Sequence, residues 1–448
     1  MQLSTRKTMD RAFSGLGVMA ILLMAGALAV LLGPMFVRGS RAFLFRGTVE
    51  HRRVMLELFG RGDRDEIRAE LALAAEARRP LYEAIAQFEK ELGEMDRGER
   101  REYGGRLDEL KAALRALLGP FPGEPQPALP RAQYGQTRWD RARVKLREVL
   151  YATTYDYSDP AQMGVEVLVP RVEQFRGTSL EPIFAHIEGN AREMLRPRLT
   201  FYGRFLTDDS RDSHFFGGIG PAVLGTLYLT IGAMLVAGPM GILSAVYLTE
   251  YAGGGWWISA IRACINTLAG VPSIVFGLFG CAFFINILQV SPSRSVLAGS
   301  LTLACLVLPT VIRASEEALR AVPATYKEAA LSLGATKWRT TFTVVLPACL
   351  PGVLTSIILS MGRAAGETAP IIFTAAVSLG AVPTLRQVFT HPTPALPWSI
   401  YNLATEHAAV DEIRHVQYGM VLTLIGVVLL LNAAAVVLRA RVTRKLRG

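Results

Sequence analysis

Long apolar stretches alternate with charged ones along this chain, and they predict helices that cross a membrane. Five segments are free or nearly free of charge: 14–37, 219–249, 264–290, 295–312 and 416–438. A sixth, 341–379, is equally apolar apart from Arg363 and Glu367. A helix needs about 20 apolar residues to cross roughly 30 Å of hydrocarbon. The pattern therefore predicts an all-α membrane protein with six transmembrane helices.

The first apolar segment could instead be a signal peptide that is cleaved. It runs for 24 residues without charge, whereas the apolar core of a signal peptide has about 7 to 15 residues. The sequence Gly33-Pro-Met-Phe36 also lacks the small-residue pattern of a cleavage site. These features favour a retained helix.

Basic residues at the ends of the spans predict the orientation, because cytoplasmic loops carry an excess of Lys and Arg. Arg6, Lys7 and Arg11 precede the first span. Five more follow the last span: Arg439, Arg441, Arg444, Lys445 and Arg447. Six spans return both termini to one side. We predict a multi-pass protein of the inner (cytoplasmic) membrane, with 1–37 as cytoplasmic N-terminus and first helix and 439–448 as a basic cytoplasmic tail.

A hydrophilic region, 38–218, separates the first two spans, and the predicted topology places it outside the cytoplasm. Its apolar residues recur at helical spacing in three runs: Ile67, Leu71 and Ala75; Leu81, Ile85, Phe88, Leu92 and Met95; Leu107, Leu110, Leu114 and Leu117. The first two runs meet at Pro80, where we expect an interruption, because proline lacks the backbone N–H that a helix needs. The runs predict a helical hairpin.

The rest of this region begins with a proline-rich stretch, 120–130, which predicts a stiff linker. A third helix is expected at 138–151, followed by a short strand at 165–169. Residues 38–218 are thus predicted to form a mainly helical extracytoplasmic insertion. It serves either as a solvated spacer or as a binding surface for an external partner.

The composition narrows the possible functions. The net charge is +10, yet 38–218 carry 30 Lys and Arg against 29 Asp and Glu, so the excess lies in the membrane part, largely at span ends. Topology explains this excess, and we expect no nucleic-acid partner. Four cysteines in or beside spans and six scattered histidines predict no disulfide framework and no metal site. No GxxxxGK[ST] phosphate loop is present, so we expect no catalytic residue and no cofactor on this chain.

A hydrophilic island interrupts the apolar half of the chain on the predicted cytoplasmic side. Within it, Glu328 offers a carboxylate to a partner's cation, and Ala329 with Ala330 gives a smooth helical face for close approach. Gly334 can end that helix with a positive φ. The island predicts a short helix outside the bilayer that a soluble partner could contact, with an ordinary loop as the alternative.

The spacing of the island matches a known pattern. Glu328-Ala-Ala, Gly334 and, after nine residues, Val344-x-Leu346-Pro347 resemble the EAA loop of ABC importer permeases, EAA-xxx-G-x9-I-x-LP. The one departure is valine in place of isoleucine at 344. Leu346 and Pro347 are expected to begin the next membrane helix. The resemblance implies that the loop 324–347 docks in a groove of a separate ATPase subunit.

The second motif places two charges inside an apolar span, in the sequence Gly362-Arg363-Ala-Ala-Gly366-Glu367-Thr368-Ala-Pro370. Arg363 and Glu367 are four residues apart and so share a helical face. An arginine near the bilayer centre costs about 2.5 to 3.5 kcal/mol, which an ion pair with Glu367 would lower. Gly362 and Gly366 would let another helix approach closely.

Two interpretations of this motif are open. Either the ion pair only fixes helix packing, or Arg363 faces a pathway and binds an anion. In the pathway interpretation, Glu367 holds the guanidinium while the site is empty. In the second case the candidate residues of the substrate pathway are Arg363, Glu367 and Thr368.

The segment 366–375, Gly-Glu-Thr-Ala-Pro-Ile-Ile-Phe-Thr-Ala, resembles the signature of the A-type (PstA) permeases of phosphate ABC importers. Segments 241–251, 270–277 and 308–323 also resemble that family. The resemblance covers 219–438 and, by position, the first span. It implies a type I ABC importer permease core with five of the six transmembrane helices in 219–438.

The same resemblance implies the function and the partners. The chain would carry inorganic phosphate together with a C-type permease subunit, two ATPase subunits that bind ATP and Mg²⁺, and a periplasmic phosphate-binding protein, all in contact with membrane lipid. Ordinary members lack a region like 38–218. Two alternatives remain, a permease for another oxyanion such as sulfate or molybdate, and a membrane sensor or signalling subunit.

Overall fold

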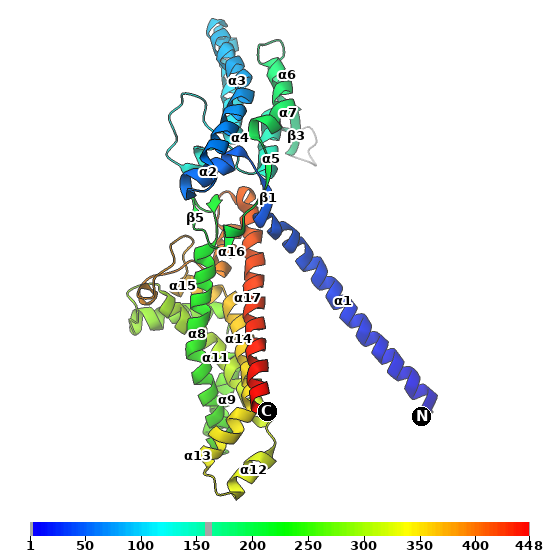
Figure 1. Cartoon of the computed structure of the whole chain (residues 1–448), viewed down its shortest axis with the longest axis vertical. Helices are drawn as coiled ribbons and strands as arrows, with labels where there is room; N and C mark the ends of the chain where they lie inside the picture. Colours follow the sequence, from blue (N-terminus) through cyan, green and yellow to red (C-terminus); the bar gives the residue numbers. More distant parts are fainter. Residues whose placement is uncertain (1–2, 157–163, 448) are drawn as a thin grey trace. The chain divides into compact units, whose positions relative to one another are not determined.

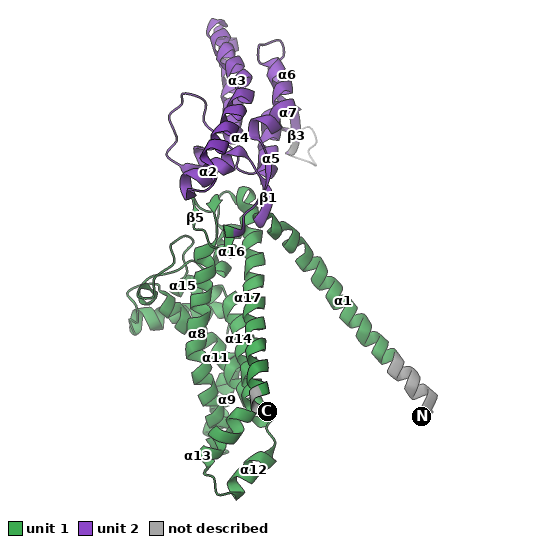
Figure 2. Ribbon diagram, in the orientation of Figure 1, with its two compact units in different colours: residues 1–42, 204–448 green, residues 43–203 purple. Residues whose placement is uncertain are grey.

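The computed structural model describes residues 3–156 and 164–447 of the 448-residue chain. Gly448, the last residue of the predicted tail, and residues 1–2 lie outside the described residues. The chain divides into two compact units, which Figure 2 colours separately. Unit 1 comprises Met1–Ala42 and Arg204–Gly448, and unit 2 comprises Phe43–Gly203.

Unit 1 is a helical core (Figure 1). Its α-helices are α1 (Leu3–Phe43), α8 (Gly220–Val246), α9 (Trp256–Leu268), α10 (Ser273–Gly280), α11 (Val296–Arg320), α12 (Ala324–Ser332), α13 (Lys337–Thr340), α14 (Leu346–Gly366), α15 (Ala369–Thr374), α16 (Leu396–Thr405) and α17 (Val410–Arg447). Three π-helical turns extend them: η4 (Tyr247–Tyr251), η5 (Cys281–Ile287) and η6 (Thr341–Val345). Two short strands, β5 (Ser210–Arg211) and β6 (Phe216–Gly217), precede α8. The mainly helical fold class predicted from the sequence is confirmed.

Among the described residues, five helices are long and apolar enough to cross a membrane: Ala12–Phe43, Gly220–Tyr251, Val296–Arg320, Lys337–Gly366 and Val410–Arg444. The sixth predicted span, 264–290, is not one straight helix. It is part of a pair, Trp256–Leu268 and Ser273–Ile287, bent by 103°. The bend falls at Gly270-Val-Pro272, because proline cannot donate the hydrogen bond that would continue α9. Pro239, in contrast, lies inside the continuous helix α8.

The directions of the helices show where this bent pair takes the chain. Ser300 Oγ of α11 lies 3.4 Å from Leu229 O of α8. Further along both helices, a Cβ added at Gly241 would lie 2.6 Å from Val311 Cγ1. The residue numbers increase in the same direction along both helices, from 229 to 241 in α8 and from 300 to 311 in α11. Helices α8 and α11 therefore run parallel. The chain between them must therefore return from one end of the core to the other, and the bent pair makes that passage.

The two remaining core helices alternate in direction. Ser315 of α11 faces Ser356 of α14, with 3.4 Å between the hydroxyl oxygens, and a Cβ at Gly352 would meet Ala318 at 2.6 Å. These pairs make α14 antiparallel to α11. Arg439 of α17 donates to Thr355 Oγ1 of α14 at 2.8 Å, whereas Gly362 lies against Val428. Helix α17 is thus antiparallel to α14 and ends near the end of the core that carries α12.

Helix α1 meets the rest of unit 1 near its C-terminus. Arg38 Nη1 donates to the Tyr418 hydroxyl at 2.8 Å, and its guanidinium also lies over the Tyr418 ring. The apolar window of α1 is otherwise exposed. Such a surface is compatible with lipid or with a partner helix.

Unit 2 is a separate helical domain with its own core. Its elements are β1 (Leu44–Gly47), α2 (Val49–Phe59), α3 (Arg64–Glu94), α4 (Arg97–Leu118), η1 (Pro130–Ala132), α5 (Trp139–Leu150), β2 (Tyr151–Asp156), β3 (Val165–Pro170), α6 (Arg171–Gln174), α7 (Glu181–Leu195) and β4 (Arg198–Phe201). Apolar residues of α3, α4, α5 and α7 form one buried cluster. The predicted helical hairpin, the third helix and the strand before Pro170 are all present. Strands β1 and β4, which enter and leave the unit, pair antiparallel with Leu44 opposite Phe201.

The predicted interruption at Pro80 is wrong, because α3 continues through it. Proline removes one helical N–H and crowds the preceding turn. His186 of α7 meets this turn: its Nε2 donates to Ala77 O at 3.2 Å. Packing against α7 therefore supplies a donor beside the proline and supports a continuous helix.

The boundaries of unit 2 differ from those expected for the insertion, 38–218. Residues 204–217 belong to unit 1. Phe205 is buried, its ring would contact a Cβ placed at Gly419 of α17, and its carbonyl accepts from Ile219 N at 2.7 Å. These contacts attach the segment before α8 to the helical core.

Candidate functional site

The hydrophilic island forms helix α12 at one end of the helical core (Figure 1). It begins after Pro323, and Gly334 follows it with φ +82°, a conformation that glycine adopts without strain. No residue of α12 is buried in this chain: Glu328 and Ala329 are exposed and Ala330 is half-buried. Leu333, in the turn after the helix, is 90% exposed. An exposed helix that ends in an exposed leucine offers a surface for a partner.

Basic residues on both sides of that surface connect the loop to helix α8. Lys327 Nζ forms an ion pair with Glu250 Oε1, whose side chain is only 9% exposed. Lys337 Nζ lies 5.2 Å from the centre of the Tyr251 ring, a cation–π contact. Glu250 and Tyr251 belong to the π-helical turn η4 at the end of α8. Both contacts therefore converge on one turn.

Sequence reasoning missed Glu250 as a site residue. Glu250 and Lys327 are 77 residues apart, and no periodicity connects them. The available signal was a lone carboxylate directly after the apolar segment 219–249.

The membrane helix after α12 begins earlier than expected. Helix α14 starts at Leu346 with Pro347 in its first turn. However, α13, η6 and α14 form one apolar helix from Lys337 to Gly366. The Leu346 N–H bonds to Thr341 O, five residues back. This π-helical turn directly precedes Pro347, which has no N–H to bond to the preceding turn.

Arg363 and Glu367 lie at a break between helices. Helix α14 ends at Gly366, Glu367 has an extended backbone (φ −78°, ψ 120°), and α15 begins at Ala369. The expectation of one continuous span, with both charges on one helical face, is therefore wrong. Gly366 and Pro370 are the residues that favour a stop and a new start.

The expected ion pair nevertheless forms. Arg363 Nε donates to Glu367 Oε1 at 3.2 Å, with side-chain exposures of 43% and 21%. Thr368, the next residue, occupies the N-cap position of α15 without a side-chain capping hydrogen bond and is half-buried. The break therefore brings together the three residues that the sequence suggested for a pathway. The ion pair between Arg363 and Glu367 thus forms although the backbone of Glu367 is not helical.

Arg363 lies closer to one end of its helix than to the middle. It follows Lys337 by 26 residues, about 39 Å along a helix axis. It is thus near the end of α14 opposite α12, and not at the centre as the sequence suggested. The free energy of placing a charge in a bilayer falls toward the interface, so this position is easier to tolerate.

The two glycines around Arg363 have different surroundings. A Cβ at Gly362 would lie 3.6 Å from Val428 Cγ1 and Asn432 Oδ1 of α17, an ordinary contact, and Gly366 faces open space. The expected close approach at Gly366 is absent among the described residues. The exposed guanidinium of Arg363 needs water or a polar partner, because lipid disfavours it. This arrangement can present a cation to an anion at a helix break. Broken helices in membrane proteins are tolerated where protein or water surrounds the irregular backbone.

Over the described residues, no group of three or more His, Cys, Asp or Glu side chains could hold a metal ion.

Residues 237–448 match the family described as binding-protein-dependent transport system inner membrane component. The match contains α12 and the Arg363–Glu367 pair. Phosphate transport system permease protein PstA 1 of Mycobacterium tuberculosis (strain H37Rv) is 39% identical over 236 residues, covering 52% of this chain and 73% of that protein. The chain belongs to this family of inner membrane components. It is an ABC importer permease and an integral inner-membrane protein.

Other relatives agree with this assignment. The permease is 36% identical to PstA of Yersinia pestis over 225 residues, which covers 50% of this chain and 73% of that protein. It is 32% identical to the probable ABC transporter permease protein YqgI of Bacillus subtilis (strain 168) over 257 residues. This match covers 54% of this chain and 85% of that protein. The resemblance to A-type permeases and the predicted permease core are confirmed.

Among solved structures, an inward-facing MetNI methionine ABC transporter has a similar chain, with 20% sequence identity, a TM-score of 0.40, and coverage of 50% of this chain and 95% of that chain. Unit 2 lies entirely outside the residues that the family model matches.

Proposed function

We propose that this permease is a subunit of an ATP-driven ABC importer for inorganic phosphate. The observation that carries the proposal is the Arg363–Glu367 pair, which is exposed at a helix break within the part of the chain that resembles phosphate permeases. A second permease, of C type, completes the pathway. This second permease contacts the present chain through apolar side chains that are exposed on unit 1.

The Arg363 guanidinium supplies paired donors that match two oxygens of a phosphate ion. In the empty state Glu367 neutralises it. An incoming anion competes with that carboxylate, which must move aside or accept a proton. Phosphate keeps at least one proton at neutral pH, so Glu367 can accept a hydrogen bond from it. Fully deprotonated sulfate can offer no such bond, and it leaves the carboxylate to repel the anion.

Helix α12 is the proposed docking element for the ATPase. Glu328, Ala329, Ala330 and Gly334 form the exposed helix and its end, and Leu346 and Pro347 connect it to α14. Two ATPase subunits bind ATP and Mg²⁺ and hydrolyse ATP. Movement of α12 reaches α8 through the Lys327–Glu250 ion pair.

The orientation follows from this docking. An ATPase in the cytoplasm places α12 there. The six passages of the chain then put both termini on the same side. Unit 2 lies outside the cytoplasm, where a phosphate-binding protein delivers the anion.

Competition between anions tests the cargo. The complex is reconstituted in vesicles with its binding protein, and uptake of radiolabelled phosphate is measured against excess unlabelled phosphate, sulfate or molybdate. We expect suppression by phosphate alone. Equal suppression by sulfate or molybdate would favour a permease for another oxyanion. If no ATPase co-purifies with the chain, the transport function is rejected in favour of a role as a membrane sensor or signalling subunit.

A further inference from the structure

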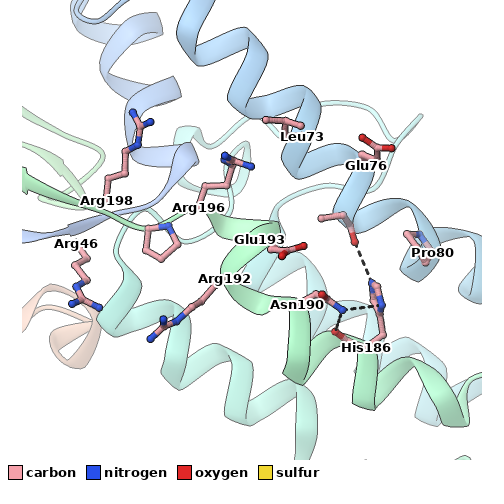
Figure 3. Close-up of a pocket in the computed structure, with 12 residues that line it drawn as sticks. Arg46, Leu73, Glu76, Pro80, His186, Asn190, Arg192, Glu193, Arg196 and Arg198 are labelled. Carbon is pink, nitrogen blue, oxygen red and sulfur yellow. Dashed lines mark hydrogen bonds between the residues drawn. The ribbon is translucent and has the colours of Figure 1, made fainter.

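Unit 2 contains a cavity of about 700 Å³ that the function proposed above does not use. Figure 3 shows its lining, which comes from α3, from the end of α7 and from strands β1 and β4. Six of the lining residues are charged: Arg46, Arg192, Arg196, Arg198, Glu76 and Glu193. All of the lining lies within unit 2.

Three of the four arginines have no partner within the described residues. Arg198 forms ion pairs with Glu66 at 2.6 Å and Glu70 at 3.0 Å. The side chains of Arg46, Arg192 and Arg196 make no hydrogen bond or ion pair within residues 3–156 and 164–447. A guanidinium binds carboxylate or phosphate oxygens with two parallel hydrogen bonds. The cavity thus presents three unused groups of this kind.

Hydrogen bonds hold two parts of the cavity lining in place. The His186 ring is held between Ala77 O at 3.2 Å and Asn190 Nδ2 at 3.1 Å (Figure 3). Arg196 ends α7 with φ +46°, a conformation that is strained for a residue with a side chain. Its carbonyl accepts from Arg52 Nη2 at 2.9 Å. The backbone that positions Arg196 is therefore held before any ligand arrives.

The two glutamates distinguish between possible occupants. Glu76 and Glu193 share the cavity with the arginines. A small dianion would meet these carboxylates together with the guanidinium groups. An extended acidic segment can direct its carboxylates to the arginines and place neutral groups beside Glu76 and Glu193. Leu73, 49% exposed, adds an apolar contact surface, and arginine beside apolar groups is typical of protein interfaces.

We infer that this cavity docks an acidic segment of the extracytoplasmic binding protein that delivers the transported anion. The inference rests on the proposed function, which supplies this partner and places unit 2 on its side of the membrane. Docking here holds the binding protein through unit 2 in addition to whatever contact it makes with the helical core. Oppositely charged surfaces also accelerate association.

Affinity measurements on the whole complex test this inference. The complex is placed in lipid nanodiscs, and binding of its purified binding protein is measured at low and at physiological salt. Arg46→Glu, Arg192→Glu and Arg196→Glu are each expected to raise the Kd about tenfold at low salt, and the triple variant more. The salt dependence of the Kd should fall in parallel. Arg143→Glu, an exposed residue of α5 outside the cavity, is the matched control and should change the Kd less than twofold.

The inference is overturned if the triple variant binds the binding protein with the wild-type Kd. It is also overturned if Arg143→Glu raises the Kd as much as the triple variant does. Inorganic phosphate is added alone as a further arm. If it binds in an arginine-dependent way and leaves the affinity for the binding protein unchanged, the occupant is a small anion and the acidic segment is excluded. Phosphate uptake by the same complex separates the two proposals. A complex that imports phosphate while its triple variant binds normally contradicts only the docking inference, whereas a wild-type complex that neither binds the protein nor imports phosphate contradicts the proposed function.

Discussion

The Arg363 guanidinium and the Glu367 carboxylate lie together at the break between α14 and α15. Their separation of four suggested an ion pair, and the pair forms at 3.2 Å. The expected reason was a shared helical face, yet Glu367 lies beyond the helix end. The sequence could identify the partners because two lone charges in an apolar segment have few alternatives. It could not locate the helix end, because the sequence does not show that α15 packs against α10. A Cβ added at Gly277 of α10 would lie 2.8 Å from Ala369 O of α15.

Replacing the carboxylate tests its proposed role. Glu367→Gln keeps the side-chain size but removes the charge that repels sulfate and weakens the acceptor for a phosphate proton. A hydrogen bond of this kind contributes about 1 to 3 kcal/mol, so we expect the preference for phosphate over sulfate to fall about tenfold. The measurement is uptake of both labelled anions by the same vesicles across a range of pH. Wild-type preference at every pH would remove Glu367 from the mechanism.

A second residue, His51 in unit 2, predicts a pH dependence. Burial, with help from Arg138 and then Arg52, lowers its pKa from 6.5 to about 4. Between these values the unfolded chain binds a proton that the folded chain does not. The stability contribution is therefore complete above about pH 6.5 and is lost as the pH falls toward 4, by at most about 1.4 kcal/mol per pH unit.

Hydrogen exchange of the full chain can detect this loss. Amides of α2 and α5 should lose protection between pH 6.5 and 4.5, after correction for intrinsic exchange rates. His51→Phe cannot titrate, and phenylalanine suits a site between the rings of Phe45 and Tyr202. We expect the variant to show a smaller loss. The same loss in wild type and variant would mean that another group is responsible.

At the scale of elements, some prolines coincide with a break between helices and others lie inside a continuous helix, and the sequence alone did not distinguish the two. Pro272 coincides with a bend of 103°, whereas Pro80 and Pro239 lie inside continuous helices. Pro272 follows Gly270 in a short segment between two helices. At Pro80 a side chain from α7 donates to a nearby carbonyl. The difference lies in tertiary contacts, which periodicity does not contain.

The ion pair between α12 and α8 gives an element-scale prediction. If it transmits movement of α12, then Glu250→Lys and Lys327→Glu should each reduce phosphate imported per ATP hydrolysed about fivefold or more, because each leaves like charges together. The exchange of both residues should restore part of the coupling. Uptake and ATP hydrolysis are measured on the same vesicles.

Exchange of Arg414 and Asp411, an exposed ion pair in α17, is the matched control and should have no effect. Single variants that remain fully coupled would contradict a transmitting role. So would a double exchange that couples no better than either single variant while its ATPase still docks.

At the scale of the whole molecule, hydropathy predicted the membrane segments because the bilayer imposes about 20 apolar residues on each. It could not reveal that Leu44 and Phe201 pair at the base of unit 2, since 156 residues separate them in the chain. Nor could it assign 204–217 to the helical core, which depends on burial of Phe205. The division into two units follows from these contacts.

That pairing predicts that unit 2 can be removed. Paired residues of adjacent strands have Cα atoms about 5 Å apart, so a two-residue Gly-Ser link between Leu44 and Phe201 can replace 45–200. We expect the shortened chain to insert and to co-purify with its ATPase, but to bind its binding protein more weakly. Membrane insertion and co-purification are the measurements. A shortened chain that fails to insert or aggregates would show that the core depends on unit 2.

The central claim is that one chain carries an anion pathway at Arg363 and a separate ATPase contact at Glu328. The most direct test is ATP-dependent phosphate uptake into vesicles that hold the reconstituted complex, with ATPase binding measured on the same preparations. Arg363→Gln should abolish uptake and leave ATPase binding intact, whereas Glu328→Lys should lose both. The claim is contradicted if the wild-type complex shows no ATP-dependent phosphate uptake, or if Arg363→Gln imports phosphate at the wild-type rate.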